Sequence, residues 1–149
     1  MDSETLYLLA QQSFINQGLN SLQSYIPNPQ TIAGSTPTSI NYSAVTITPG
    51  TWFIDAHCVA TDAVTGNNIV NYWIGTNSGT TTGALAGTEA RIGSPSVFIA
   101  NLRITHIVTV TATTNIYCGI YCTDSITVQS YNNYNGVGNM TGIHAIQLV

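Results

Sequence analysis

The sequence predicts an all-β protein: a jelly-roll sandwich of about eight strands, preceded by a short N-terminal helix. Three observations support this class. From residue 40 onward apolar residues recur with a period of two, the recurring types are Val, Ile, Thr and Tyr, and clusters of Gly, Asn and Ser separate the runs. Many short strands without helical periodicity between them are typical of sandwiches and jelly rolls.

Residues 1–26 are expected to form the helix, which would serve as a stalk or an anchor. Asp2, Ser3 and Glu4 suit a helix start, and Pro27 suits its end. Apolar residues at alternating steps of three and four, with one Gln between them, form a short heptad seam: Leu8, Gln12, Ile15, Leu19, Leu22 and Ile26. Three heptads are marginal for a free coiled coil, so the seam packs either on its own domain or on another chain.

Residues 27–39 are expected to be a linker, because they contain three prolines, a glycine and small polar residues. Residues 40–149 would then form the knob domain. The alternation places one set of side chains of the second strand toward the core and another set outward. Eight strands are expected, near residues 40–48, 51–61, 68–76, 88–92, 97–111, 115–123, 125–131 and 142–149.

Composition excludes several classes of partner. The chain has 149 residues, no lysine, only Arg91 and Arg103 as basic residues, and a net charge of −4. Two arginines cannot form the basic patch that nucleic acid or an anionic membrane surface requires. No apolar run reaches the length of a membrane span, and the acidic N-terminus does not resemble a secretory signal. Only 5% of residues are charged, which favours burial of part of the surface in an assembly.

The sequence contains no recognisable catalytic motif, and we expect neither enzymatic activity nor a cofactor. Cys58, Cys118 and Cys122 are expected to be buried free thiols, since cysteine on a strand behaves as a small hydrophobe. His57, His106 and His144 do not converge by strand parity. A metal held by three copies of His144 on a threefold axis remains an alternative.

Two sets of aromatic residues are candidates for contact surfaces. Tyr117 and Tyr121 lie on the outward side of one strand with Gly119 between them, which favours an interface between subunits or, alternatively, a second layer within the chain. A second set could stack on sugar rings: Tyr72, Trp73, Tyr131 and Tyr134.

Parts of the knob also resemble a known group of proteins. Residues 43–60, which include AVTITPGTWFIDAHCVA, residues 102–123 with their Thr-Ala-Thr-Thr turn, and the ending TGIHAIQLV resemble phage virion proteins with a tumour-necrosis-factor-like or complement-globular-head-like jelly roll. The resemblance implies a homotrimer without catalytic residues. It also implies that the last strand runs near the threefold axis, which adds His144, Ile146 and Leu148 to Tyr117 and Tyr121 as expected interface residues.

The expected function is therefore that of a trimeric structural protein on a virion surface, made in the host cytoplasm: a head fibre, a decoration protein or a fibre tip. The N-terminal helix would attach to other virion proteins, and deletion of residues 1–30 would leave a folded knob. The alternatives are an adhesin tip that binds a receptor or host glycan and, less favoured, a jelly-roll subunit of the capsid shell.

Overall fold

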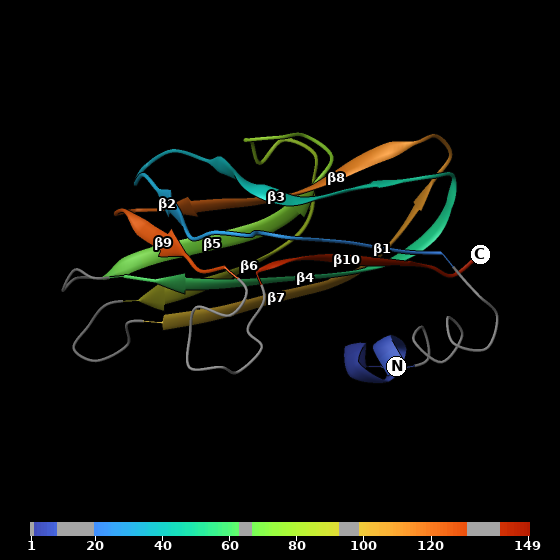
Figure 1. Ribbon diagram of the computed structural model, residues 1–149, viewed down its shortest axis with the longest axis horizontal. Coiled ribbons are helices and arrows are strands. Elements are labelled where there is room, and N and C mark those ends of the chain that lie inside the picture. Colours follow the sequence, from blue (N-terminus) through green and yellow to red (C-terminus); the bar gives the residue numbers. More distant parts are fainter. Residues whose placement is uncertain (1, 9–19, 63–66, 93–98, 131–140) are drawn as a thin grey trace.

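The chain folds into two antiparallel sheets that pack face to face (Figure 1). The computed structural model describes residues 2–8, 20–62, 67–92, 99–130 and 141–149. The first sheet contains β1 (Ser21–Tyr25), β2 (Gln30–Ile32), β4 (Gly50–Thr61), β7 (Ile99–Val110), β9 (Ile126–Val128) and β10 (Gly142–Gln147). The second contains β3 (Thr38–Ile47), β5 (Asn68–Gly75), β6 (Ala84–Ile92) and β8 (Thr114–Cys122). The predicted all-β jelly-roll class is confirmed.

Strand β4 organises the first sheet. Along one edge it pairs with β7 over its whole length, and along the other it pairs first with β10 and then with β9. Strand β1 adds to β10, and β2 adds to β9. The second sheet has the order β3-β8-β5-β6. All eight predicted strands are present, with ends that differ by a few residues from the expected ones.

The core lies between the inner faces of the two sheets, as the period-two pattern predicts. On β4 the inward set is fully buried, and the indole Nε1 of Trp52 donates to the carbonyl of Thr48 at 2.9 Å. The three cysteines are free and buried within this core, as expected. The inward side chains of β4 are Trp52, Ile54, Ala56, Cys58 and Ala60, and those of β8 are Ile116, Cys118, Ile120 and Cys122.

The predicted helix over residues 1–26 is wrong at its C-terminal end. Only residues 3–8 are helical among those described, and residues 21–25 form β1. Leu22 and Ile26 are four residues apart, a spacing that fits both a helix and a strand. Hydrogen bonding to β10 selects the strand, and Ile26 is buried in the core. The expected seam residues Gln12, Ile15 and Leu19 lie outside the described residues.

The expected linker over residues 27–39 also contributes to the sandwich. Its residues 30–32 form β2, which pairs with β9, and Ile32 is buried in the core. Residues 1–30 therefore include strand β1 and the buried core residue Ile26, so we expect their deletion to destabilise the sandwich and not to leave an intact knob. A deletion that spares the sandwich must end before β1.

Candidate interaction surface

The outer face of the first sheet carries a row of apolar side chains that runs across three strands. Ile146 on β10 and Ile107 on β7 lie directly opposite Phe53 on β4, on either side of it. Phe53 and Ile146 point out of the sandwich, yet both are buried, because Leu6, Tyr7 and Leu148 pack over them. We call Ile146, Phe53 and Ile107 the apolar row.

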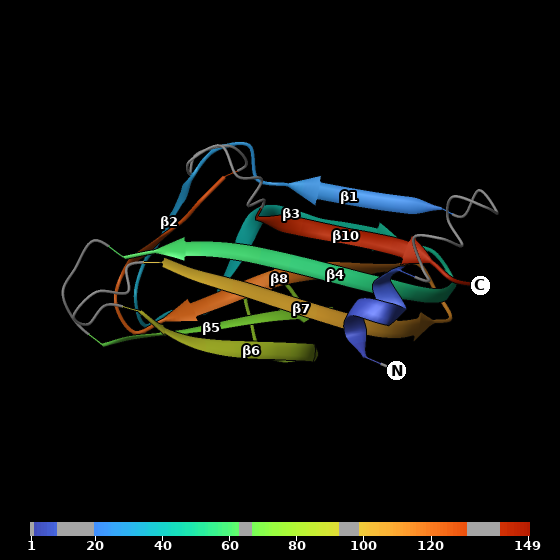
Figure 2. The same ribbon diagram turned by 90° about the horizontal axis from the view of Figure 1, so that it is seen from below.

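The cover over this row comes from the N-terminal segment, residues 2–8. Asp2 caps its helical turn: Thr5 donates to Asp2 Oδ1 from its backbone N–H at 2.8 Å and to Oδ2 from its hydroxyl at 3.0 Å. These hydrogen bonds lower the pKa of Asp2. The segment lies beneath the layer of β4 and β7 (Figure 1) and crosses the face of that sheet (Figure 2). The predicted helix start at Asp2–Glu4 is confirmed.

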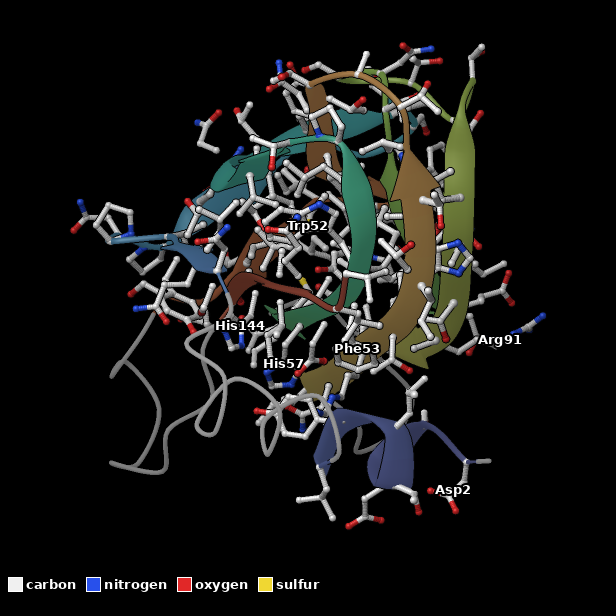
Figure 3. All side chains as sticks on the ribbon, turned by 90° about the vertical axis from the view of Figure 1, so that its right-hand side faces the viewer. Asp2, Trp52, Phe53, His57, Arg91 and His144 are labelled. Carbon is white, nitrogen blue, oxygen red and sulfur yellow. The ribbon has the colours of Figure 1, made fainter. Side chains whose placement is uncertain are left out.

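Tyr7 is the side chain that joins the N-terminal segment to the sheet. Its ring lies 5.8 Å from that of Phe53, measured between centroids, and the guanidinium of Arg103 lies 5.4 Å from the same ring. Figure 3 shows Phe53 and His57 between the strands and the helical turn. One aromatic ring therefore packs on the apolar row and stacks against a cation at the same time.

A polar cluster lies beside the apolar row on the same face. Arg103 donates to both carboxylate oxygens of Asp55, at 2.8 and 2.9 Å, and this pairing raises the pKa of Arg103. His144 lies opposite Asp55 on β10, and its Nε2 is 2.8 Å from the hydroxyl oxygen of Ser21. Burial lowers the pKa of His144. Asp55, Arg103 and His144 line a cavity of about 220 Å³ together with Tyr7, Tyr25, His57 and Gly142.

Part of this face remains uncovered in a single copy of the chain. Among the described residues, the large hydrophobic side chains that are exposed are Leu8, Ile107 and Val149. Leu8 belongs to the N-terminal segment, Ile107 ends the apolar row, and Val149 directly follows Leu148, which packs on that row. Leu8 and Ile107 thus place exposed apolar side chains on the face that carries the apolar row, and grouped apolar side chains of this kind are a feature of protein–protein contact sites.

The expected interface residues are divided between the two sheets. His144, Ile146 and Leu148 belong to the first-sheet face, whereas Tyr117 and Tyr121 lie on the outer face of the second sheet. Both tyrosines are half-buried by their own chain. Trp73 packs on Gly119 between them, and Asn115 Nδ2 donates to the hydroxyl of Tyr117 at 3.2 Å. The two tyrosines therefore do not form the bare aromatic surface that the sequence pattern indicates.

The expected sugar-stacking residues need correction. Tyr72 points into the core and is only 1% exposed, so its ring cannot contact a ligand. Trp73 is 5% exposed, and its Nε1 donates to the carbonyl of Thr80 at 3.2 Å, so it does not present a ring face to solvent. The sequence alone could not show that both rings are buried. Adjacent strand residues point to opposite faces, and the outward ring, Trp73, is covered only because the connection between β5 and β6 folds back to it. Tyr131 and Tyr134 lie outside the described residues.

The described residues contain no group of three or more His, Cys, Asp or Glu side chains placed to hold a metal ion. Within that same part of the chain, no helix has the length and apolar character needed to cross a membrane.

Comparison with known proteins shows which type of jelly roll this chain has. No protein-family model matches the sequence, and no curated protein matches it significantly. Among solved structures, the Eiger TNF from S. frugiperda aligns with a TM-score of 0.60 at 8% identity, over 88% of this chain and 93% of that chain. The chain has a TNF-like jelly-roll fold.

Two further structures resemble this jelly roll. Murine APRIL at pH 5.0 aligns with a TM-score of 0.52 at 10% identity, over 86% of this chain and 98% of that one. The globular domain of the zebrafish complement 1qA protein aligns with a TM-score of 0.48 at 7% identity, over 87% and 97%. At identities this low the likeness defines the architecture alone.

Proposed function

We propose that this chain is a non-enzymatic knob that assembles as a homotrimer on the surface of a virus particle, as a head fibre, a decoration protein or a fibre tip. The observation that carries the proposal is the apolar row on the first-sheet face, of which Ile107 stays uncovered in a single copy. An exposed apolar side chain in line with buried ones favours a further layer of protein on that face.

Three copies, rather than two, are supported by the TNF-like jelly roll together with the resemblance to trimeric virion proteins. The low charge of the chain agrees with an assembled state, because few charged groups would be desolvated when copies meet.

A binding or structural role, rather than catalysis, is supported by the polar cluster itself. Its carboxylate, Asp55, accepts hydrogen bonds from two nitrogens of Arg103, a bidentate pairing typical of ion pairs with a structural role.

The oligomeric state tests the proposal directly. Multi-angle light scattering on the purified full-length chain should give a mass near three times 15.8 kDa. A monomer at micromolar concentration would contradict the trimer, and closed shells in the electron microscope would favour a capsid subunit instead.

The location on a virion needs a separate experiment. Gold-labelled antibodies raised against the knob should decorate intact particles of the virus that encodes the chain. Removal of residues 1–8 keeps every strand but uncovers Phe53 and Ile146, so the shortened knob should fold with reduced stability, and it should no longer attach to particles. Particles that carry no label would overturn the location, and full attachment of the shortened chain would overturn the role of the N-terminal segment.

A further inference from the structure

A shallow groove lies on the outer face of the second sheet, on the side of the sandwich away from the apolar row. It runs over β5 and β6 and has a volume of about 400 Å³. The residues of interest in its lining are Asn71, Trp73, Thr81, Ala84, Gly87 and Glu89. The groove is formed within a single copy of the chain and does not depend on the proposed trimer.

Two glycines create the groove. Trp73 lies opposite Gly119 on β8 and opposite Gly87 on β6, so its indole has a residue without a side chain on each side. The indole leans over Gly119, where an added Cβ would fall 2.3 Å from a ring carbon. Gly87 lies on the other side of Trp73 and carries no side chain, and both residues line the groove.

The hydrogen bond from Trp73 Nε1 to Thr80 holds the indole in this position. Thr80 belongs to the connection between β5 and β6, and the next residue, Thr81, lines the groove. The wall is thus fixed by its contacts in the free protein, and a ligand would not have to order it. Preformed walls are typical of small-molecule sites.

The other end of the groove is polar. Asn71 and Glu89 lie directly opposite each other on β5 and β6, and both side chains line the groove. Within the described residues neither side chain has a hydrogen-bond or ionic partner. The pair therefore offers a carboxylate that can accept two hydrogen bonds beside an amide that can both donate and accept.

We propose that this groove binds a neutral sugar ring. An edge of the ring would contact Trp73 and Ala84, and neighbouring hydroxyls would donate to the Glu89 carboxylate and exchange hydrogen bonds with Asn71 and Thr81. The mixture of acceptors, an amide donor and a threonine hydroxyl suits a polyhydroxylated ligand better than a simple cation, which would use Glu89 alone. The indole contributes contact along its side and no face-on stacking, as its burial requires.

Saturation-transfer and ¹⁵N-correlation NMR on the full-length chain test the proposal. The probes are the methyl glycosides of glucose, galactose, mannose, N-acetylglucosamine and N-acetylgalactosamine, with ethanolamine as a cationic probe. At least one glycoside should bind and shift the signals of the Trp73 indole N–H and the Gly87 amide. Glu89→Gln should weaken that binding about tenfold or more, since it removes a charged acceptor and keeps the shape. Asn71→Ala should weaken it as well.

Matched controls are Glu4→Gln and Asn101→Ala, which make similar changes at exposed positions on the first-sheet side. These variants should bind like the unaltered chain. The proposal is wrong if no glycoside of the panel binds, if only ethanolamine binds, or if Glu89→Gln and Asn71→Ala leave glycoside binding unchanged. Unaltered melting temperatures of the two groove variants would exclude misfolding as the cause of a loss.

Discussion

Ile107 and Phe53 lie directly opposite each other on β7 and β4, yet 39% of Ile107 is exposed and only 1% of Phe53. Both side chains point out of the sandwich on the same face. The difference arises because Leu6 and Tyr7 pack over Phe53 and leave Ile107 at the margin of their cover. The N-terminal segment thus completes one part of this face and leaves the neighbouring part for another molecule.

Replacement of Ile107 by Asn should weaken self-association. Burial of an isoleucine side chain contributes on the order of 2 kcal/mol, so its loss should raise the concentration needed for assembly by at least tenfold. Light scattering over a dilution series measures this shift.

Ile69→Asn is the matched variant, because Ile69 is a partly buried strand residue opposite Arg91, on the outer side of the second sheet near Tyr121. If copies meet through the first-sheet face, Ile107→Asn dissociates the assembly and Ile69→Asn does not. The reverse result would support the interface through Tyr117 and Tyr121 that the sequence pattern suggests.

Gly119→Ala should destabilise the fold. An added Cβ would fall within 2.5 Å of three atoms of the Trp73 indole, so the ring would have to move from its hydrogen bond with Thr80. Overpacking of this kind costs about 1–3 kcal/mol. Urea denaturation measures the free energy of unfolding.

The control replaces Trp73 by Phe, which has a smaller ring. In that background Gly119→Ala should lower the free energy of unfolding by less than it does in the unaltered chain. Equal effects in both backgrounds would argue against a clash with the indole.

Most of the fold could be predicted from the sequence, because apolar and polar residues alternate along the strands. On β4 and β8 every second residue is apolar, and a one-residue shift would place that whole set in water, so the faces are strongly specified. Strand β1 lacks this signal, since Ser24 occupies the inward position between Leu22 and Ile26. Its conformation is decided by pairing with β10, at the other end of the chain.

The candidate surface was harder to predict, because it depends, like β1, on contacts between residues that are far apart in the sequence. Phe53 and Ile146 look like ordinary members of alternating strands, and nothing local indicates that Tyr7 covers them. Tyr72 and Trp73 are adjacent aromatic residues that point to opposite faces, and both are buried, one by the core and the other by the connection that contains Thr80. Contacts between residues far apart in sequence leave no local pattern to detect.

The stability of the folded chain should fall on mild acidification, in part through His144. Burial lowers the pKa of this imidazole below its ordinary value of 6.5, and the nearby charge of Asp55 opposes the shift. The unfolded chain then binds a proton more readily than the folded chain. Stability that is complete above pH 6.5 is therefore lost as the pH falls toward the folded-state pKa.

The variant His144→Gln tests this contribution, because glutamine does not titrate and can still hydrogen-bond to Ser21. The decrease in melting temperature between about pH 7.5 and about pH 5 should be smaller for the variant than for the unaltered chain. Identical decreases would show that His144 does not contribute.

The buried thiols should not react while the chain is folded. Burial raises the pKa of Cys118 to about 11 and that of Cys58 still further, so neither forms the thiolate that attacks a disulfide reagent. With Ellman's reagent at mildly alkaline pH, these two thiols should react only when the chain unfolds. In denaturant all three cysteines should react. The variant Asn101→Cys, which places a thiol at an exposed position on β7, should react at once under native conditions and so verify the reagent. Rapid native labelling of Cys58 or Cys118 would contradict this expectation and would mean that the core opens readily under native conditions.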